Sequence, residues 1–422
     1  MVREWMKLDN AAKIYPLVES DFLTTVFRFS ITLNIDIDKD ILLKALNNII
    51  KRFPYYKVTL KKGIFWYYLE ENKQDLLVFK DEDLPCRRML KEDNNGYLFR
   101  VLYIDKKISI EFNHILGDGT ACLIFLCTLT HEYLRLVGIN VSINEWIKDI
   151  NEEVDEKEFE DSHSIIGKKH LHTHNKKLKV IKNVFHIKGR ILNRKKYLIT
   201  YGIMDAQNLY ETAKKFKASI TVFLTSLYLE TLLEIQKETV KKRKRKPVAI
   251  QVPINMRKRL DSVSMRNFSL FIRPYLYPDE DYSFEKIIEI VKDYFTEYTT
   301  NDNLLALMVQ NYRTEKTPFV RLLPLVLKSL ITPLIYKAVG ADTYSGTISN
   351  IGMVKLPNDM EEYVQRIDFV LGPCPITKTL CAVSGYKDQV FISFGRSIKD
   401  ALVERKFFRK LVELGVKVHV EN

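Results

Sequence analysis

The chain has 422 residues, of which 46% are hydrophobic and 11% aromatic, and this composition excludes global disorder. The length exceeds the size at which one hydrophobic core keeps growing, so two domains are expected. The formal net charge of +13 predicts a surface that attracts anions, whether nucleic acid, an anionic membrane, a phosphate-rich cofactor or an acidic carrier domain.

The first part of the chain has the pattern of an α+β domain. Apolar and polar residues alternate over 25–37, which predicts a half-buried strand. A helix capped by Asp38 or Asp40 should follow, because apolar residues then repeat at helical spacing. The remaining elements expected in this half are a hairpin over 55–69, a second hairpin over 97–112 and a helix over 121–137.

A charged segment separates the two halves of the chain. It is acidic over 144–161 and basic over 168–182, and paired charge blocks of this kind indicate a solvated connector. We therefore expect an N-terminal domain over 1–150, a linker over 151–183 and a C-terminal domain over 184–422.

The second half again mixes strands and helices, and its helix over 221–236 is apolar on most faces, which predicts burial. Strands are expected over 184–187, 197–203, 248–252, 346–350, 364–371, 379–386 and 389–394. Helices are expected over 205–216, 221–236, 282–298 and 399–414.

Two stretches of this half have an unusual composition. Residues 241–246 are all basic, but no aromatic residue interleaves with them as a nucleic-acid stacking platform would need, so we expect a solvated loop. Residues 322–339 are the most apolar stretch, interrupted by lysines and prolines. We expect one or two buried or substrate-channel helices there, with a shallow membrane-facing role as the less favoured alternative.

Metal binding and secretion are not expected. The five cysteines form no CxxC pair or Cys/His cluster, which indicates reduced thiols in cores. His170, His172 and His174 alternate in a polar segment without a fourth ligand, so we expect no zinc there. The first residues contain no long apolar run of the secretory type, and this favours a cytoplasmic location.

The segment 112–120 lies where a predicted strand ends and a predicted helix begins. His114 is at the strand exit, and histidine can accept a proton at neutral pH. Asp118 is close enough in sequence to turn back beneath the histidine, while Gly117 and Gly119 permit a tight turn. On this segment alone, a surface loop with a structural histidine and a helix-capping aspartate is an equal alternative.

Residues 113–119, NHILGDG, resemble the HHxxxDG motif of the condensation-domain-like acyltransferase superfamily. That superfamily includes chloramphenicol acetyltransferase relatives, alcohol acetyltransferases and peptide-synthetase condensation domains. The first histidine of the motif is Asn113 here, whereas His114 has the position of the catalytic second histidine.

Two later segments carry the same resemblance. Asn255 and Arg257 are similar to the family's N-x-R element, and residues 347–352, TISNIG, are similar to the SNxG segment of the alcohol acetyltransferase branch. The three motifs occur in the family's order and span most of the chain. The resemblance implies an α+β fold of two chloramphenicol-acetyltransferase-like domains, a pseudo-dimer with a central tunnel.

The resemblance also implies roles for these residues. His114 would be the general base in the tunnel, and Gly119 would complete its motif. Asp118 would be a structural acid that pairs with Arg257 and points away from the reaction. Asn255 is a candidate support for that pair.

The oxyanion of the reaction needs a hydrogen-bond donor. Candidates are Ser349, Asn350 and Thr347, with Gly352 allowing the backbone to approach. An ordinary strand and turn is an equal alternative for this segment.

The implied donor is an acyl-CoA or an acyl carrier protein, used as substrate with no permanently bound cofactor. The implied acceptor is an alcohol or amine, possibly lipidic, with at most peripheral membrane contact and no nucleic acid. Two alternatives stay open: a condensation-type enzyme with carrier-bound substrates, and a catalytically silent basic binding protein that uses residues 241–246.

Overall fold

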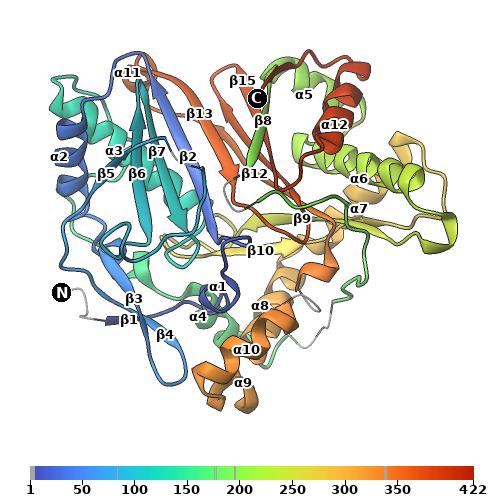
Figure 1. Ribbon diagram of the computed structural model, residues 1–422, viewed down its shortest axis with the longest axis horizontal. Helices are drawn as coiled ribbons and strands as arrows, with labels where there is room; N and C mark the ends of the chain where they lie inside the picture. Colours follow the sequence, from blue (N-terminus) through green and yellow to red (C-terminus); the bar gives the residue numbers. More distant parts are fainter. Residues whose placement is uncertain (1–4, 83, 175, 177, 194–195, 337–339) are drawn as a thin grey trace.

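The computed structural model describes residues 5–422 apart from 83, 175, 177, 194–195 and 337–339. Two lobes lie side by side, each with a β-sheet and helices packed against it (Figure 1). The predicted α+β class is confirmed, and each lobe has its own large hydrophobic core.

The sheet of the first lobe has five strands in the order β13-β2-β7-β6-β5. The second predicted hairpin is confirmed, since Phe99 of β6 pairs with Phe112 of β7 and the chain turns at Asp105, whose φ is +45°. The strand bounds are β2 (Val26–Leu33), β5 (Val78–Lys80), β6 (Phe99–Ile104), β7 (Lys107–Asn113) and β13 (Val364–Leu371).

Two predicted helices cover this sheet. In α2 (Lys39–Ile49), Asp38 is the N-cap and accepts hydrogen bonds from the backbone N–H groups of the first turn. Helix α3 (Gly119–Leu136) packs on β2 and β7 and is capped by Asp118. Gly138, at φ +89°, follows its C-terminus, where a glycine can adopt the left-handed conformation that ends a helix.

Strand β13 belongs to the first lobe although its sequence lies deep in the second half of the chain. It pairs antiparallel with β2, and the ring of Phe369 stacks on Phe29 with centroids 4.2 Å apart. The local pattern predicted a strand here but not its partner, because alternation is the same in either sheet. The division at 151–183 stays a prediction, and the chain crosses between the lobes after that point as well.

The sheet of the second lobe has eight strands, with β12 in parallel between β9 and β14. Their bounds are β8 (Leu198–Asp205), β9 (Val248–Asn255), β10 (Ser269–Ile272), β11 (Tyr275–Leu276), β12 (Gly346–Val354), β14 (Thr379–Tyr386), β15 (Gln389–Arg396) and β16 (His419–Glu421). The helices are α5 (Ala206–Lys215), α6 (Ile220–Thr239), α7 (Phe284–Tyr298) and α12 (Leu402–Glu413). Helix α6 is buried, as predicted. The strand predicted over 184–187 is wrong, because that segment runs outside any sheet and Phe185 donates one hydrogen bond to the carbonyl of Pro247.

A smaller layer lies below the two lobes in Figure 1. It contains a sheet ordered β1-β4-β3 and several short helices. Its elements are β1 (Trp5–Lys7), α1 (Tyr15–Val18), β3 (Val58–Lys62), β4 (Tyr67–Glu71), α4 (Ser162–Lys169), α8 (Asn301–Lys316), α9 (Pro318–Leu322) and α10 (Leu325–Ile335).

The apolar stretch 322–339 does not form a buried helix. Most apolar side chains of α10 face solvent, whereas Lys328 is buried. The prediction of burial was wrong because a lysine in this helix finds a partner inside the protein, which the apolar count could not show. Residues 337–339 lie outside the described part of the chain.

The charged segment 151–183 is not wholly a solvated connector. Glu158 is buried and accepts hydrogen bonds from Arg52 at 2.7 and 2.8 Å and from Tyr55 at 2.8 Å. Helix α4 packs on α8, and its His163 is buried against Phe268. The charge of Glu158 in this segment is therefore balanced by Arg52 inside the protein and is not solvated by water.

The basic run 241–246 forms a turn beside α6. Arg245 donates to the carbonyls of Lys237 and Val240 at 2.9 and 3.1 Å, and Lys246 donates to Asn183 at 2.6 Å. Two of its side chains thus hold local structure.

Among the described residues no single helix is long and apolar enough to cross a membrane. Helices α5 and α6, which meet at an angle of 75°, are together long and apolar enough by length and composition alone. In the same part of the chain, no three His, Cys, Asp or Glu side chains gather as a possible metal site.

Removing Arg52 should destabilise the fold more than removing an exposed charge. Arg52→Met is expected to lower the free energy of unfolding by roughly 3 kcal/mol or more, because Glu158 keeps a buried charge with fewer partners. Chemical denaturation at neutral pH measures this loss. Glu71→Gln removes an exposed ion pair with Lys57 and should change the free energy by less than about 1 kcal/mol. Equal losses of unfolding free energy in Arg52→Met and Glu71→Gln would contradict a stabilising role for the buried Arg52–Glu158 pair.

Candidate active site

His114 follows the last residue of β7, and both lobes hold its backbone. Its N–H donates to the carbonyl of Thr25 at 2.8 Å, just before β2. Its carbonyl accepts a hydrogen bond of 2.8 Å from Nδ2 of Asn267, just before β10. The strand-exit position predicted from sequence is thus fixed from two sides.

The imidazole of His114 lies between two aromatic rings. The centroid of Phe27 is 4.4 Å away and that of Tyr15 is 5.3 Å away, the latter nearly stacked. The residue is partly exposed, but its Nδ1 is buried and has no hydrogen-bond partner among the described residues. Burial lowers the pKa of His114, so the ring is neutral at pH 7 and able to accept a proton.

Asp118 points into the second lobe. Its Oδ2 accepts from Nη1 of Arg257 at 2.8 Å, from the N–H of Phe268 at 2.9 Å and from Oγ of Ser269 at 3.1 Å. Its Oδ1 accepts from the N–H of Ala121, which caps α3. Burial alone would raise the pKa of Asp118, but the Arg257 charge and these donors hold it below its usual value.

Arg257 and Asn255 shape the segment that follows β9. The Arg257 guanidinium donates to the carbonyls of Ser264 and Arg266, both at 2.7 Å, in addition to Asp118. Oδ1 of Asn255 accepts from the Arg257 N–H at 3.0 Å, and its Nδ2 donates to Oγ1 of Thr120 at 3.0 Å. Asn255 therefore supports the arginine and touches the start of α3.

The two glycines of the motif differ in the space around them. A Cβ on Gly117 would lie 2.7 Å from the carbonyl oxygen of Met265, which backbone packing does not allow. A Cβ on Gly119 would lie 3.7 Å from Ile351 and Phe29, an ordinary contact. Close approach of the lobes therefore requires glycine at 117 and not at 119.

Asn113, in place of the family's first histidine, holds the turn. Its Oδ1 accepts from Oγ1 of Thr25 at 3.0 Å and from the N–H of Ile115 at 2.9 Å. Its Nδ2 donates to Glu19 at 3.2 Å. Both the oxygen and the nitrogen of the Asn113 amide thus hold the turn that carries His114.

The SNxG segment lies in β12, where the ladder with β14 is irregular after Asn350. Asn350 donates to Oγ1 of Thr221 at 3.0 Å and accepts from the N–H of Gly352, whose φ is +81°. Ser349 is half-buried and its hydroxyl has no partner among the described residues. Ile351, beside Gly119, is the link between this segment and the His114 loop.

The structure thus brings His114, Asp118, Gly119, Asn255 and Arg257 into one contact network. Sequence reasoning missed Tyr15, Asn267 and Asp9, which accepts from Asn267 at 3.1 Å. No motif marks them, because they reach the site from distant segments. In the sequence, Asp9 lies two residues before the pair Ala11 and Ala12, which indicates no more than a residue that caps a local turn.

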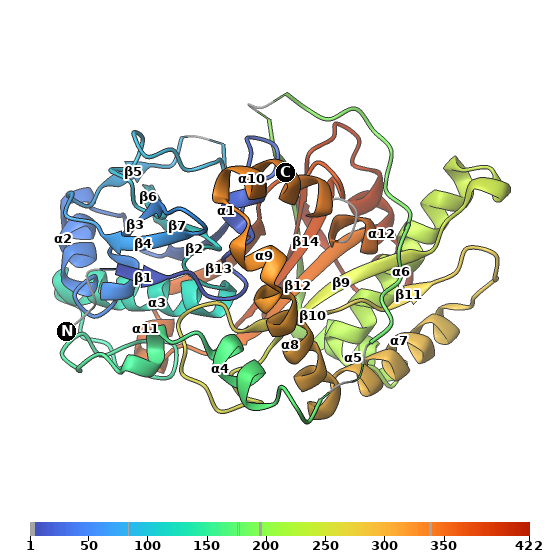
Figure 2. The ribbon, with the colours of Figure 1, turned by 90° about the horizontal axis from the view of Figure 1, so that it is seen from below.

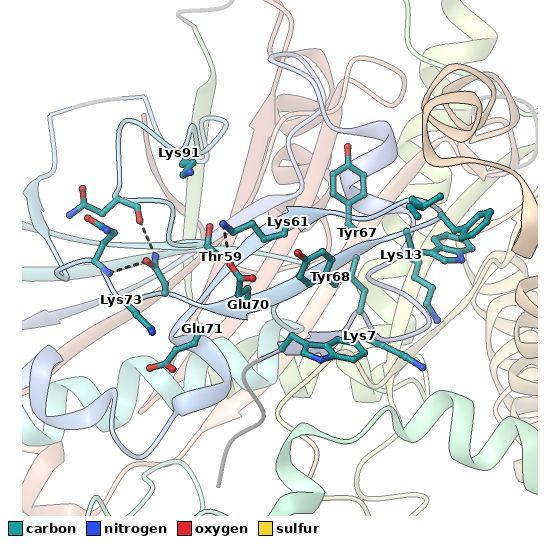
Figure 3. A pocket seen from close by; sticks show the side chains of 18 of the residues that line it. Lys7, Lys13, Thr59, Lys61, Tyr67, Tyr68, Glu70, Glu71, Lys73 and Lys91 are labelled. Atoms are coloured by element: carbon teal, nitrogen blue, oxygen red, sulfur yellow. Dashed lines mark hydrogen bonds and ion pairs between the residues drawn. The ribbon is translucent and has the colours of Figure 1, made fainter.

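Two cavities are described, and His114 lines neither. The larger, of about 1490 Å³, lies over the β1-β4-β3 sheet, with several lysines and aromatic residues around it (Figure 3). The smaller, of about 180 Å³, lies between the Asp21–Thr24 turn and residues 191–193, 196 and 197. The tunnel through His114 that the resemblance implies stays a prediction.

Substituting the two glycines should separate their roles. Gly117→Ala is expected to lower stability by about 1–3 kcal/mol, because the added methyl group presses on the Met265 carbonyl. Gly119→Ala should leave stability unchanged or slightly higher, since alanine loses less backbone entropy in a helix. Thermal unfolding of both variants measures the difference, and a larger loss at Gly119 would contradict the packing.

No family model and no curated protein matches the chain. Solved structures do match. Polyketide synthase associated protein 5 from Mycobacterium tuberculosis superposes with a TM-score of 0.63 at 14% identity, over 97% of this chain and 98% of that one. The trichothecene 15-O-acetyltransferase TRI3 from Fusarium sporotrichioides gives 0.59 at 13% identity, over 97% and 94%. The starter condensation domain of rhizomide synthetase gives 0.61 at 11% identity, over 97% and 94%.

These likenesses span nearly the whole of each chain, and at such identities they establish the fold alone. At 97% coverage of this chain, both lobes are included in the match. The chain has the two-lobed α+β fold of the condensation-domain-like and chloramphenicol-acetyltransferase-like acyltransferases.

Proposed function

We propose that the protein transfers an acyl group from a CoA or carrier-protein thioester to an alcohol or amine, with His114 as general base. The observation that carries this proposal is the His114 ring. It is neutral at pH 7, partly exposed and held where the two lobes meet.

In the proposed reaction the acceptor O–H or N–H gives its proton to a neutral nitrogen of His114. The acceptor atom attacks the thioester carbonyl carbon, and the C=O electron pair moves to oxygen. The tetrahedral intermediate then reforms the carbonyl and expels the thiolate, which takes the proton back from the imidazolium. A thioester is already activated, so no serine or cysteine nucleophile is needed.

Asp118 has a positioning role in this proposal. All of its hydrogen bonds run to Arg257 and the second lobe or to the first turn of α3, and none runs to the His114 ring. It orients the His114 loop from below, and Asn255 supports its arginine partner. Its negative charge also raises the pKa of His114 against the effect of burial.

Among the three predicted oxyanion donors, Ser349 is a better candidate than Asn350. The Asn350 amide is committed to Thr221 and to Gly352, whereas the Ser349 hydroxyl is free to turn. Loss of one oxyanion donor costs about 10²–10³ in rate.

The net charge and the structural neighbours support the proposed thioester donor. A surface with net charge +13 attracts the phosphates of CoA or an acidic carrier. The rhizomide starter condensation domain was solved with C8-CoA, and TRI3 is an O-acetyltransferase. An alcohol acceptor is favoured, with the condensation reaction on carrier-bound amines as the second candidate because a condensation domain superposes comparably well.

Replacing His114 tests the general base. His114→Ala should lower the rate of acyl transfer by about 10²–10⁴, the usual contribution of general base catalysis. Thiol release from a series of acyl-CoAs with a panel of small alcohols and amines measures it. His419→Ala, at a side chain that is 75% exposed, is the matched control and should be unchanged.

The pH profile of the same reaction is a second measurement on His114. Because its pKa lies below 6.5, kcat/KM should rise from acid and level off before neutral pH. A rise centred above 6.5 would contradict His114 as the general base. Thiol release unaffected by His114→Ala would favour the alternative of a catalytically silent basic binding protein.

Replacing Asp118 tests the positioning role. Asp118→Asn keeps an N-cap for α3 but breaks the charge pair, so unfolding free energy should fall by about 3–5 kcal/mol along with activity. Because the folded-state pKa of Asp118 is lowered, its contribution exists above about pH 4 and fades as pH falls below that. Asp205→Asn, an exposed N-cap of α5, is the control. Lost turnover with unchanged stability would contradict a purely positioning role.

A further inference from the structure

Helix α10 is amphipathic, but its apolar side faces solvent and its charged residue faces the protein. Val326, Leu330 and Leu334 repeat every fourth residue and are 72%, 65% and 71% exposed. Lys328, the only charged residue of this helix, is 4% exposed. A helix in water normally has the opposite arrangement, with its charge outside and its leucines inside.

The hairpin between β3 and β4 fixes this orientation. Nζ of Lys328 donates to the carbonyl of Phe65 at 2.8 Å and lies 3.5 Å from the centre of the Trp66 ring. The N–H of Leu325 donates to the carbonyl of Ile64 at 2.9 Å. Burial lowers the pKa of Lys328 to about 8. The lysine is therefore an internal anchor for the helix.

The same contacts place the exposed hairpin tip beside the helix. Ile64 is 78% exposed, and Phe65 and Leu322 are exposed as well. These residues form one apolar surface with the helix, which we call the α10 face: Ile64, Phe65, Leu322, Val326, Leu330 and Leu334. A gathering of exposed apolar side chains of this kind marks an interaction site.

Positive charge borders the α10 face. Lys62 lies at the hairpin tip and Arg321 next to Leu322, both exposed. Residues 318–335 contain no aspartate or glutamate. Glu70 of the neighbouring strand is already paired with Lys61 at 3.0 Å. The apolar face with a basic rim is complementary to an anionic surface.

Helix α10 also lies close to the candidate active site. It packs on α1, as Figure 2 shows near the junction of the lobes. The first residue of α1 is Tyr15, whose ring stacks on His114. One short helix, α1, therefore connects α10 with the proposed base.

We propose that the α10 face docks on an anionic lipid bilayer, so that the acceptor is an alcohol or amine with an apolar tail drawn from the membrane. The identity of the acceptor rests on the proposed function, whereas the docking does not. Interfacial helices bind with their apolar side in the headgroup region and basic residues toward anionic lipids. A helix of this length lies on the bilayer and does not span it.

A bilayer fits this face better than a protein partner does. The exposed side chains of α10 that form the face are aliphatic and offer no hydrogen bonds for a specific contact, whereas lipid needs none. The rim charges have one sign, as a surface of anionic headgroups requires.

Co-sedimentation of the full chain with vesicles tests the docking. Wild type should bind vesicles of phosphatidylcholine mixed with phosphatidylglycerol, bind phosphatidylcholine alone more weakly, and be released by salt. The triple variant Val326→Ser, Leu330→Ser, Leu334→Ser should bind roughly tenfold or more weakly. The matched control is Tyr210→Ser, Val412→Ser, Val420→Ser, three exposed apolar residues of the second lobe, and it should bind like wild type.

Two further measurements separate the docking from the transferase proposal. His114→Ala should bind vesicles like wild type, whatever its activity. The α10 triple variant should retain thiol release with a water-soluble alcohol but lose it with a long-chain alcohol supplied in vesicles.

Equal vesicle binding by the α10 triple variant and wild type overturns the docking proposal, as does absence of binding by wild type. A wild-type dimer in light scattering that the α10 triple variant converts to monomer, without vesicle binding, overturns it in favour of contact between copies. Vesicle binding together with thiol release that survives His114→Ala overturns the transferase proposal and leaves the docking standing.

Discussion

The ion pair between Asp118 and Arg257 is the contact on which the arrangement of the site depends. Asp118 begins α3 in the first lobe, and Arg257 organises the segment after β9 in the second. Their charged atoms are 2.8 Å apart and both side chains are under a tenth exposed. Because a buried charge without a partner is costly, the two lobes pack stably only in the register that brings Asp118 and Arg257 together.

That register determines what surrounds His114. With Arg257 in place, its guanidinium fixes the carbonyls of Ser264 and Arg266, and Asn267 then reaches the carbonyl of His114. Gly117 fits against Met265 only because it lacks a side chain. The position of the imidazole is therefore a consequence of contacts between lobes more than of its own strand.

Sequence reasoning predicted the features that depend on residues close to one another in the chain. Apolar alternation and capping residues predicted β2, α2, the β6–β7 hairpin and the buried α6, and spaced motifs led to the fold. It missed what depends on partners far along the chain: the sheet that receives β13, the burial of Glu158 and the inward turn of Lys328. A lysine among leucines has the same sequence whether it faces water or stacks on Trp66. Tyr15 and Asn267 reach His114 from segments far before and far after it in the chain, so no motif could have paired them.

The pairing of β13 with the first lobe also constrains the order in which the protein can fold during synthesis. During synthesis the first lobe has β5, β6, β7 and β2 long before residues 364–371 leave the ribosome. Until then the outer edge of β2, with its apolar residues Phe27 and Phe29, has no neighbouring strand. An open edge of this type invites wrong pairing with other nascent chains. The lobe that carries the histidine can thus be completed only after residues 364–371 have been synthesised, which ties assembly of the site to a strand made long after the histidine itself.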